Sequence, residues 1–344
     1  MADEIGVAVV GAGYWGPNLI RNFGNAPGWE LRWVCDLDPS RAARALGKRS
    51  TVTLTDNLAD VLDDARVDAV AIATPPSSHA SLAIEAMEAG KHVLVEKPLA
   101  SSAAEGEKMV DVAEDRGLVL MIDHTYCYTP VVRHLRELIR SDGIGEIQYI
   151  DSVRINLGLV QRDTDVFWDL APHDLSILDF ILPDHVGPAG VAASGADPIG
   201  AGQACVGYLT IPLTNGGIAH IHVNWLSPTK IRQTIVGGSK RMVVWDDLNP
   251  SQRLSMYDKG VEMIPSLSTD ERRVAKVSYR TGDMVAPALP EREALEGVVA
   301  EFHAAISEGR QSLTDGRAGL RVLRILEATT LSMLSAGATV GVDA

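Results

Sequence analysis

The pattern of apolar and polar positions divides the sequence into two parts. In the first part, short uninterrupted apolar runs alternate with stretches of helical periodicity. Such runs are typical of strands buried on both faces of a parallel sheet, and the stretches between them predict the covering helices. The predicted strands are 7–10, 31–35, 51–53, 69–73, 92–95 and 118–122. The predicted helices include 39–46, 57–62, 79–89 (capped by Ser77 or Ser78) and one that Ser101-Ser102 caps.

The pattern changes after residue 123. A helix is predicted at 130–140, a long strand at 147–155 and a further helix at 168–182. Apolar or alternating stretches then follow without helices between them, which indicates an open, mostly antiparallel sheet. These stretches are 204–211, 217–224, 230–236 and 241–245. The polar, proline-interrupted stretch 269–290 is predicted to be a loop, and helices at 291–308 and 315–335 follow it.

These patterns predict an α/β protein of two domains. Residues 1–123 form an N-terminal Rossmann domain with a doubly wound parallel sheet, and residues 124–344 form an α+β domain with a large, mostly antiparallel open sheet. A chain of 344 residues is long enough for two cores of ordinary size.

A glycine-rich turn with the sequence GAGYWG follows the first predicted strand. Its first glycine permits a tight turn, its second lets the backbone approach a diphosphate, and its third lets helix and strand pack closely. The diphosphate would lie at the start of the next helix, where free N–H groups favour negative charge. The turn therefore predicts a dinucleotide site that includes Gly11, Gly13, Tyr14, Trp15 and Gly16.

Asp36 ends the second predicted strand, twenty residues after the last of these glycines. A carboxylate there can accept hydrogen bonds from the ribose hydroxyls of the adenosine half, and it would repel a 2′-phosphate. The position favours NAD over NADP. The alternative is that Asp36 only caps the turn before the helix that starts at Asp38-Pro39.

Composition narrows the class of partner. Asp and Glu outnumber Lys and Arg by 45 to 31, a net charge of −14, which argues against a nucleic-acid partner. Three widely spaced cysteines give no disulfide framework and fit a reducing compartment. The acidic N-terminus lacks the features of a signal peptide, and no apolar run reaches the length of a membrane span. We expect a cytoplasmic chain that does not enter a membrane.

Lys97 follows the fifth predicted strand, at the edge of the sheet where ligands bind. Pro98 restricts its backbone, so the side chain is directed by the chain rather than free to wander. An ammonium there can bind the nicotinamide ribose and exchange a proton with an alcohol. The alternative is an ordinary surface lysine after a strand.

Asp169 and His173 are four residues apart and would share one face of a helix. A carboxylate beside an imidazole is a common general acid–base arrangement. A structural alternative has equal weight, because Pro172 suits the first turn of a helix, and Asp169 would then be its N-cap.

Together, GAGYWG, the Glu96-Lys97-Pro98 element and the sequence Trp168-Asp169-Leu170-Ala171-Pro172-His173-Asp174 resemble the glucose–fructose oxidoreductase / inositol dehydrogenase / rhizopine catabolism (Gfo/Idh/MocA) family. The resemblance covers nearly the whole chain, and it is closest to members that oxidise or reduce C3 of nucleotide-linked sugars.

The resemblance implies an NAD-dependent oxidoreductase that moves a hydride between nicotinamide and a secondary hydroxyl of a pyranose. Lys97, Asp169 and His173 would surround the reacting carbon, and the second domain would bind substrate. Further cofactor contacts would come from Thr74, Pro75, His79, Glu96 and His124, although relatives often have asparagine in place of His124. The face of a strand that carries Arg154 and Asn156 would point toward the substrate.

Two alternatives remain, an inositol or free-sugar dehydrogenase and a non-catalytic dinucleotide sensor. Arg162 and Arg280 are predicted loop arginines that could meet a nucleotide diphosphate. His220 and His222 have a metal-like spacing, but no third ligand lies nearby in sequence. We therefore expect no metal, and the resemblance implies a homodimer or homotetramer that pairs through the C-terminal sheet.

Overall fold

The computed structural model describes residues 4–49, 51–161, 164–183, 190–264 and 276–342 of the chain. The chain divides into two compact units. Unit 1 takes its residues from Met1–Thr129, Leu175–Phe180 and Glu291–Glu327, and unit 2 from Pro130–Asp174, Ile181–Pro290 and Ala328–Ala344. This division is more interleaved than a single cut after residue 123, because two later segments join the N-terminal unit.

Unit 1 is built on a six-stranded parallel sheet with the order β3-β2-β1-β4-β5-β6. This is the doubly wound order, in which the sequence of strands runs outward in opposite directions from the boundary between β1 and β4. The strands are β1 (Ile5–Val10), β2 (Trp29–Cys35), β3 (Thr53–Thr55), β4 (Ala69–Ile72), β5 (His92–Glu96) and β6 (Leu120–Asp123). Val7, Ala8 and Val9 are fully buried, as a strand covered on both faces requires. The predicted Rossmann sheet is confirmed.

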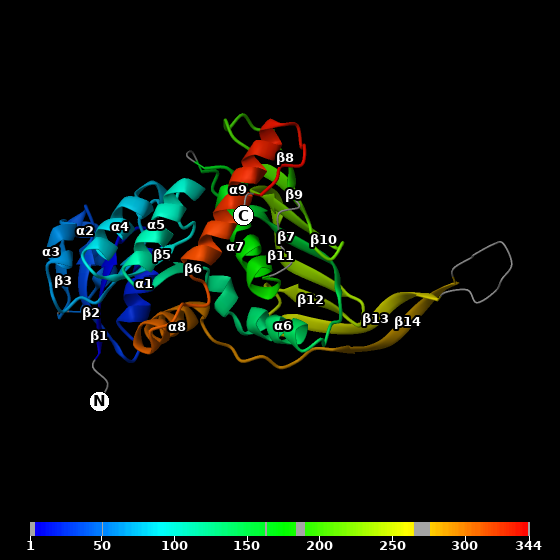
Figure 1. The fold of residues 1–344 in the computed structure, drawn as a ribbon, viewed down its shortest axis with the longest axis horizontal. Helices are drawn as coiled ribbons and strands as arrows, with labels where there is room; N and C mark the ends of the chain where they lie inside the picture. The colour runs from blue at the N-terminus through cyan, green and yellow to red at the C-terminus, as the bar shows by residue number, and fades with distance from the viewer. Residues whose placement is uncertain (1–3, 50, 162–163, 184–189, 265–275, 343–344) are drawn as a thin grey trace. The chain divides into compact units, whose positions relative to one another are not determined.

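The helices of unit 1 surround this sheet in Figure 1. They are α1 (Gly16–Phe23), α2 (Pro39–Leu46), α3 (Leu58–Leu62), α4 (His79–Glu88), α5 (Ala103–Asp115) and α8 (Ala294–Glu308), with short 3₁₀ turns η1 (Pro76–Ser78) and η2 (Thr125–Tyr128). Ser102 caps α5 by accepting a hydrogen bond from the Glu105 N–H. Ser78 holds the N-cap position of α4, as one of the two predicted serines, but its side chain makes no capping hydrogen bond and its Oγ instead donates to the Thr74 hydroxyl and the Pro75 carbonyl oxygen.

Unit 2 is built on an eight-stranded sheet with the order β14-β13-β12-β11-β7-β10-β9-β8. Among the described strands of this sheet only the β7–β10 pair is parallel, so the predicted open, mostly antiparallel sheet is confirmed. The strands are β7 (Ile147–Leu157), β8 (Ala192–Ala196), β9 (Val206–Pro212), β10 (Ile218–Asn224), β11 (Leu226–Gly238), β12 (Met242–Asp246), β13 (Leu254–Ile264) and β14 (Lys276–Val285). Helix α6 (Pro130–Arg140) precedes β7, α7 (Val166–Ile181) follows it, and α9 (Gly316–Leu334) runs from one unit into the other.

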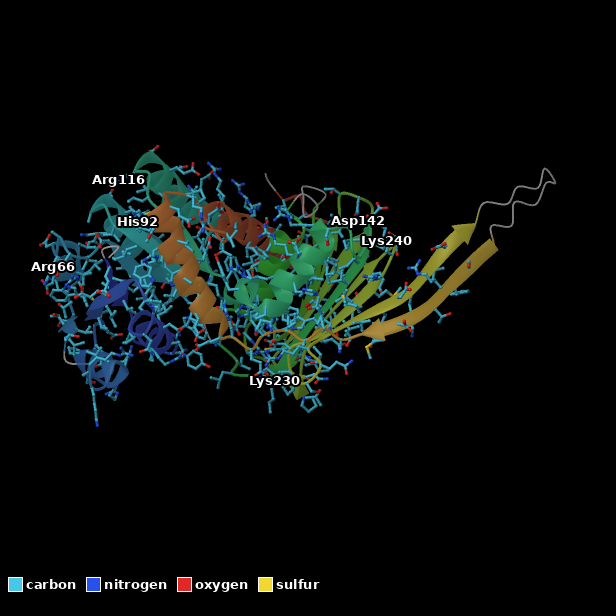
Figure 2. The ribbon with its side chains drawn as sticks, turned by 90° about the horizontal axis from the view of Figure 1, so that it is seen from below. Arg66, His92, Arg116, Asp142, Lys230 and Lys240 are labelled. Carbon is cyan, nitrogen blue, oxygen red and sulfur yellow. The ribbon has the colours of Figure 1, made fainter. Side chains whose placement is uncertain are left out.

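The predicted loop at 269–290 is wrong where the structure describes it, because 276–285 is strand β14. Residues 269–275 lie outside the described part of the chain. Beyond Tyr257, β13 pairs with β14 alone, and the two strands run as a ribbon away from the rest of the sheet (Figure 1). Both faces of this ribbon meet solvent, so its sequence does not show the alternation that identifies a half-buried strand. Asp142, in the turn before β7, and Lys240, in the turn between β11 and β12, form an ion pair (Figure 2).

Helix α7 covers one face of the unit 2 sheet. The ring of Phe167 lies where a Cβ of Gly207 would be, and Asp174 bonds Ser152 and Arg154 of β7. The opposite face carries Tyr208, His220 and His222, whose rings stack. None of the helices in the described part of the chain combines the length and apolarity that crossing a bilayer requires.

Candidate active site

The glycine turn of unit 1 has the geometry that a dinucleotide needs. Gly11 has φ of +94°, which side chains rarely adopt, and a Cβ there would press on Ala73 at the end of β4. A Cβ on Gly16 would collide with the Gly11 carbonyl oxygen. At Gly13, by contrast, an added Cβ would meet no atom within 4 Å. The open space therefore lies at the glycine that the sequence assigns to the diphosphate, so the cradle fits this group.

Asp36 is buried beside this turn and is already engaged. One carboxylate oxygen accepts a hydrogen bond from Ala12 N at 2.7 Å, and the other accepts from Asp38 N at 2.8 Å. The guanidinium of Arg41 lies 3.8 Å away. The carboxylate therefore fixes the glycine turn in addition to standing at the predicted ribose position. Its bond to Asp38 N caps the turn before α2, as the alternative holds, while the helix itself is capped by Asp38.

Two large apolar side chains next to the turn are almost fully exposed. Tyr14 is 96% exposed and Leu37 is 91% exposed. Exposed apolar groups that flank a ligand cradle are candidates to cover the ligand. Tyr14 was predicted from the sequence, whereas Leu37 was not. Its signal was an apolar residue directly after the acidic end of β2, in a stretch that is otherwise polar.

The end of β4 is fixed by a buried histidine. His79 is fully buried, and its ring nitrogens lie 2.9 Å from the Pro98 carbonyl oxygen and 2.8 Å from the Thr74 carbonyl oxygen. Burial lowers its pKa. His79 thus braces the turn after β4 against the segment that carries Lys97, while Thr74 and Pro75 form the edge itself.

Polar groups gather where β5 and β6 end, since Glu96 and Asp123 are paired in the sheet. Asp123 is fully buried and accepts hydrogen bonds from Trp15 Nε1 at 2.8 Å and Thr125 Oγ1 at 2.7 Å. Burial raises the pKa of Asp123, and burial together with the Asp123 charge raises that of Glu96 well above its ordinary value. This pair lies beside Lys97, whose charge acts on both carboxyls.

His124 follows directly and is 2% exposed, with no hydrogen-bond partner on either ring nitrogen. Burial, and then the charge of Lys97, lowers its pKa to about 3, so the ring is neutral at ordinary pH. Asp123 was not among the residues predicted for the site. An acidic residue that ends an apolar strand at the ligand edge of a parallel sheet was the available signal.

The candidate residues Asp169 and His173 lie in unit 2, on α7. Asp165 caps this helix, since its Oδ1 accepts hydrogen bonds from Phe167 N at 2.9 Å and Trp168 N at 3.0 Å. The alternative that Asp169 is the N-cap is therefore excluded, and Pro172 lies inside the helix. Asp169 and His173 are both half-buried and stand one turn apart.

Arg154 is more occupied than its predicted substrate contact suggests. Its guanidinium forms a bidentate ion pair with Asp174, at 2.8 Å and 3.1 Å, and only 5% of its side chain is exposed. It thereby links β7 to the residue that follows His173. Asn156, two residues further along β7, is half-buried.

Comparison with known proteins identifies the family of the chain. The profile of the Gfo/Idh/MocA oxidoreductase family, which describes an NAD-binding Rossmann fold, matches residues 5–124. UDP-N-acetylglucosamine 3-dehydrogenase of Acidithiobacillus ferrooxidans is 30% identical over 262 residues, which cover 75% of this chain and 76% of that protein. The chain belongs to the Gfo/Idh/MocA family. It is an NAD-binding oxidoreductase.

Other comparisons extend this result. A crystal structure of the same Acidithiobacillus enzyme superposes with a TM-score of 0.81 at 26% identity, covering 96% of this chain and 98% of that one. The NAD complex of GenD2 from gentamicin A biosynthesis has a TM-score of 0.81 at 24% identity, covers 100% of this chain and 98% of that one, and supports the fold. Inositol 2-dehydrogenase 3 of Saccharopolyspora erythraea is 31% identical over 184 residues, 52% of this chain and 54% of that protein.

The two predicted loop arginines of this oxidoreductase have different outcomes. Arg280 is not in a loop, because it lies on β14 and pairs with Asp258 at 2.9 Å and Glu262 at 2.7 Å. Its charge is thus balanced by two carboxylates. Arg162 lies outside the described residues. Among the residues that the structure does describe, no group of three or more His, Cys, Asp or Glu side chains is arranged to hold a metal ion.

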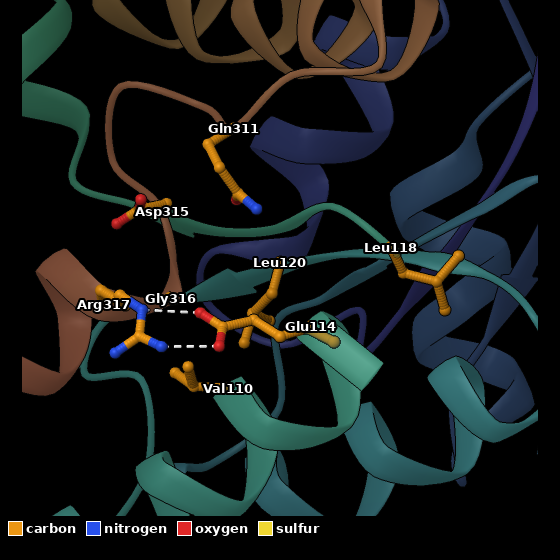
Figure 3. A pocket seen from close by; sticks show the side chains of 9 residues that line it. Val110, Glu114, Leu118, Leu120, Gln311, Asp315, Gly316 and Arg317 are labelled. Carbon is orange, nitrogen blue, oxygen red and sulfur yellow. Dashed lines mark hydrogen bonds and ion pairs between the residues drawn. The ribbon is translucent and has the colours of Figure 1, made fainter. Parts of the chain in front are cut away.

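Unit 1 also has a pocket of about 70 Å³ whose lining residues do not include the glycine turn or Lys97 (Figure 3). It is lined by Val110 of α5 and Leu120 at the amino end of β6, and the ion pair between Glu114 and Arg317 borders it. Small-molecule sites commonly measure roughly 300–1,000 Å³. The pocket is too small for a dinucleotide and lies at the opposite end of β6 from Asp123.

Proposed function

We propose that this oxidoreductase is an NAD-dependent dehydrogenase or ketoreductase that acts on a pyranose CH–OH group, namely C3 of a nucleotide-linked sugar. One observation carries the proposal: the relative that shares 30% identity over three quarters of the chain is a UDP-N-acetylglucosamine 3-dehydrogenase. The Asp165 cap supports it, because the N-cap of α7 is then Asp165 and Asp169 needs another explanation.

The chemistry divides among three side chains. Bound NAD supplies the hydride acceptor for oxidation. His173, alone or with Lys97, takes the proton of the substrate hydroxyl and returns it in the reverse direction. Asp169 holds that hydroxyl and orients the imidazole. Removing a general acid or base typically costs about 10²–10⁴-fold in rate.

A substrate panel tests the proposal directly. UDP- and dTDP-sugars, free pyranoses and inositols are each incubated with NAD and with NADP, and reduction of the nicotinamide is followed by absorbance. Turnover of a nucleotide-linked sugar with loss of the C3 hydrogen is the expected result. Turnover of inositols or free sugars alone would favour the second candidate, for which the likeness to inositol 2-dehydrogenase 3 speaks.

The Lys97→Ala variant separates an enzyme from a sensor. It is expected to lose at least a hundredfold in turnover while NAD binding, measured by calorimetry, stays within about threefold. Lys108→Ala, at an exposed position on α5, is the matched control. NAD binding without turnover of any panel compound by the wild type would support the sensor and overturn the proposal.

We also propose a cytoplasmic homodimer or homotetramer that pairs through the sheet face of unit 2 opposite α7. Tyr149, Gly237, Met242 and Tyr257 are paired across four neighbouring strands and therefore lie on this face. Val261 is four residues after Tyr257 on β13, so it lies on the same face, and Tyr279 of β14 is its pairing partner. Exposed apolar side chains recur on this face, and Tyr279 is 76% exposed. Such a patch is typical of an interface.

Light scattering after gel filtration tests this part. Tyr208→Glu and Tyr279→Glu are each expected to shift the assembly toward monomer, because the new charge would be buried on pairing. Leu334→Glu, at an 80% exposed apolar position on α9, is the control and should leave the mass unchanged. A monomeric wild type at micromolar concentration would overturn the oligomer.

A further inference from the structure

A buried tryptophan contacts the carboxylate that the proposed function uses. Trp225 stands between β10 and β11 and is 1% exposed. Its Nε1 donates a hydrogen bond of 3.0 Å to Oδ2 of Asp169. A buried indole N–H that meets a carboxylate forms a charge-assisted bond, which is stronger and more directional than a neutral one.

The backbone of Trp225 is held on both sides. Its N–H donates to the Cys205 carbonyl oxygen at 3.0 Å, and its own carbonyl oxygen accepts from Gly158 N at 2.9 Å. A Cβ on Gly158 would lie 3.3 Å from the indole Cδ1, so this glycine gives the ring its room. The indole N–H is therefore held in a fixed position, so its hydrogen bond to Asp169 costs little further conformational entropy of the Trp225 side chain.

Helix α7 has separate anchors around Asp169. Asp165 caps its first turn, Trp168 Nε1 donates to Thr330 Oγ1 at 3.0 Å, and Asp174 pairs with Arg154. These contacts hold the helix as a body. The bond from Trp225 differs from them because it acts on the carboxylate of Asp169 itself.

We propose that Trp225 is a positioning residue for Asp169: its buried indole N–H holds the carboxylate in one orientation, so that the carboxylate presents the same acceptor geometry to substrate in every turnover. The inference rests on the proposed function, which gives Asp169 its part in the reaction. Trp225 is not required to touch substrate or cofactor in this scheme.

Trp225→Phe removes the N–H and keeps an aromatic ring. A hydrogen bond to a charged group is worth enough that its loss should lower kcat by about ten- to a hundredfold. KM for NAD should stay within about twofold, because Asp169 lies in unit 2 and the cofactor residues lie in unit 1. Trp168→Phe is a matched control. Trp168 precedes Asp169 on α7, and the change removes an indole hydrogen bond of the same length that does not involve Asp169. It should keep kcat within about threefold of the wild type.

A double-mutant cycle separates positioning from general loosening. If Trp225 acts through Asp169, then Trp225→Phe in an Asp169→Ala background should lower kcat no further. Equal kcat losses in Trp225→Phe and Trp168→Phe, or additive losses in the cycle, would overturn the inference while the proposed function stands. Near wild-type activity of Asp169→Ala alone would instead overturn the proposed role of Asp169.

Discussion

The buried carboxylate of Asp36 allows a sharp test of the dinucleotide site, because it has two tasks that mutation can separate. It accepts hydrogen bonds from the N–H groups of Ala12 and Asp38, and the sequence assigns to it the ribose hydroxyls. Asp36→Ala removes both bonds. Asp38 is half-exposed, so its N–H can bind water instead, whereas Ala12 is buried. A lost bond to a charged acceptor costs about 1.5–3 kcal/mol when the donor stays buried. We therefore expect the free energy of unfolding to fall by about 2–3 kcal/mol.

Urea unfolding and calorimetric titration with NAD and NADP check this expectation. Asp36→Ala should weaken both cofactors, since the glycine turn loses its brace. Asp36→Asn keeps an oxygen that can accept from Ala12, so its stability should lie near that of the wild type, while its preference for NAD over NADP falls by about tenfold. Asp38→Ala is the control, because it removes the α2 cap at a cost of about 1 kcal/mol and leaves cofactor affinity unchanged.

Two outcomes would refute this reasoning separately. If Asp36→Ala unfolds at the same urea concentration as the wild type, the carboxylate does not brace the turn. If Asp36→Asn keeps the wild-type ratio of NAD to NADP affinity, the ribose assignment fails.

Three further predictions follow from single contacts. Gly13→Ala should fold normally but lose NAD affinity at least tenfold by calorimetry, whereas Gly16→Ala should unfold at lower urea, because only the second Cβ meets backbone. Burial lowers the pKa of His124 to about 3 from 6.5, so the unfolded chain takes up the proton first and stability is lost as pH falls from 6.5 toward 3. The slope is at most about 1.4 kcal/mol per pH unit, and His124→Asn should remove it in acid-unfolding curves. Arg154→Ala should cost about 3–5 kcal/mol in urea unfolding, since it leaves Asp174 buried without its guanidinium, and a loss below 1 kcal/mol would contradict the geometry.

Elements whose boundaries are marked by neighbouring residues were predictable. Both α2 and α6 begin and end at the predicted residues, Pro39–Leu46 and Pro130–Arg140. Each begins with a proline, which suits the first helical position, and Asp38 caps α2. Local chemistry alone determines these starts, so no knowledge of the rest of the chain was needed.

Strands β13 and β14 were not predictable by the same reasoning. Apolar and polar residues alternate along a half-buried strand because one of its faces is buried. Beyond the sheet, neither described face of this ribbon is buried in that way. Val261 and Tyr279 stand opposite each other on one face with more than half of each side chain exposed, while Arg280 and Glu262 pair on the other. Only the pairing of the two strands identifies them, and the sequence of one strand alone does not predict this pairing.

Asp169 lies between these two cases. Its spacing from His173 was readable from the sequence, but whether it capped a helix depended on where α7 starts. That question had a local answer in Asp165, four residues earlier, which caps the helix in place of Asp169. The partner of that carboxylate had no local answer. Trp225 is 56 residues away, and only the register that brings the end of β10 beside α7 joins the two. Sequence spacing can therefore nominate an acid–base pair, whereas the groups that orient it have to be read from the sheet against which the helix packs.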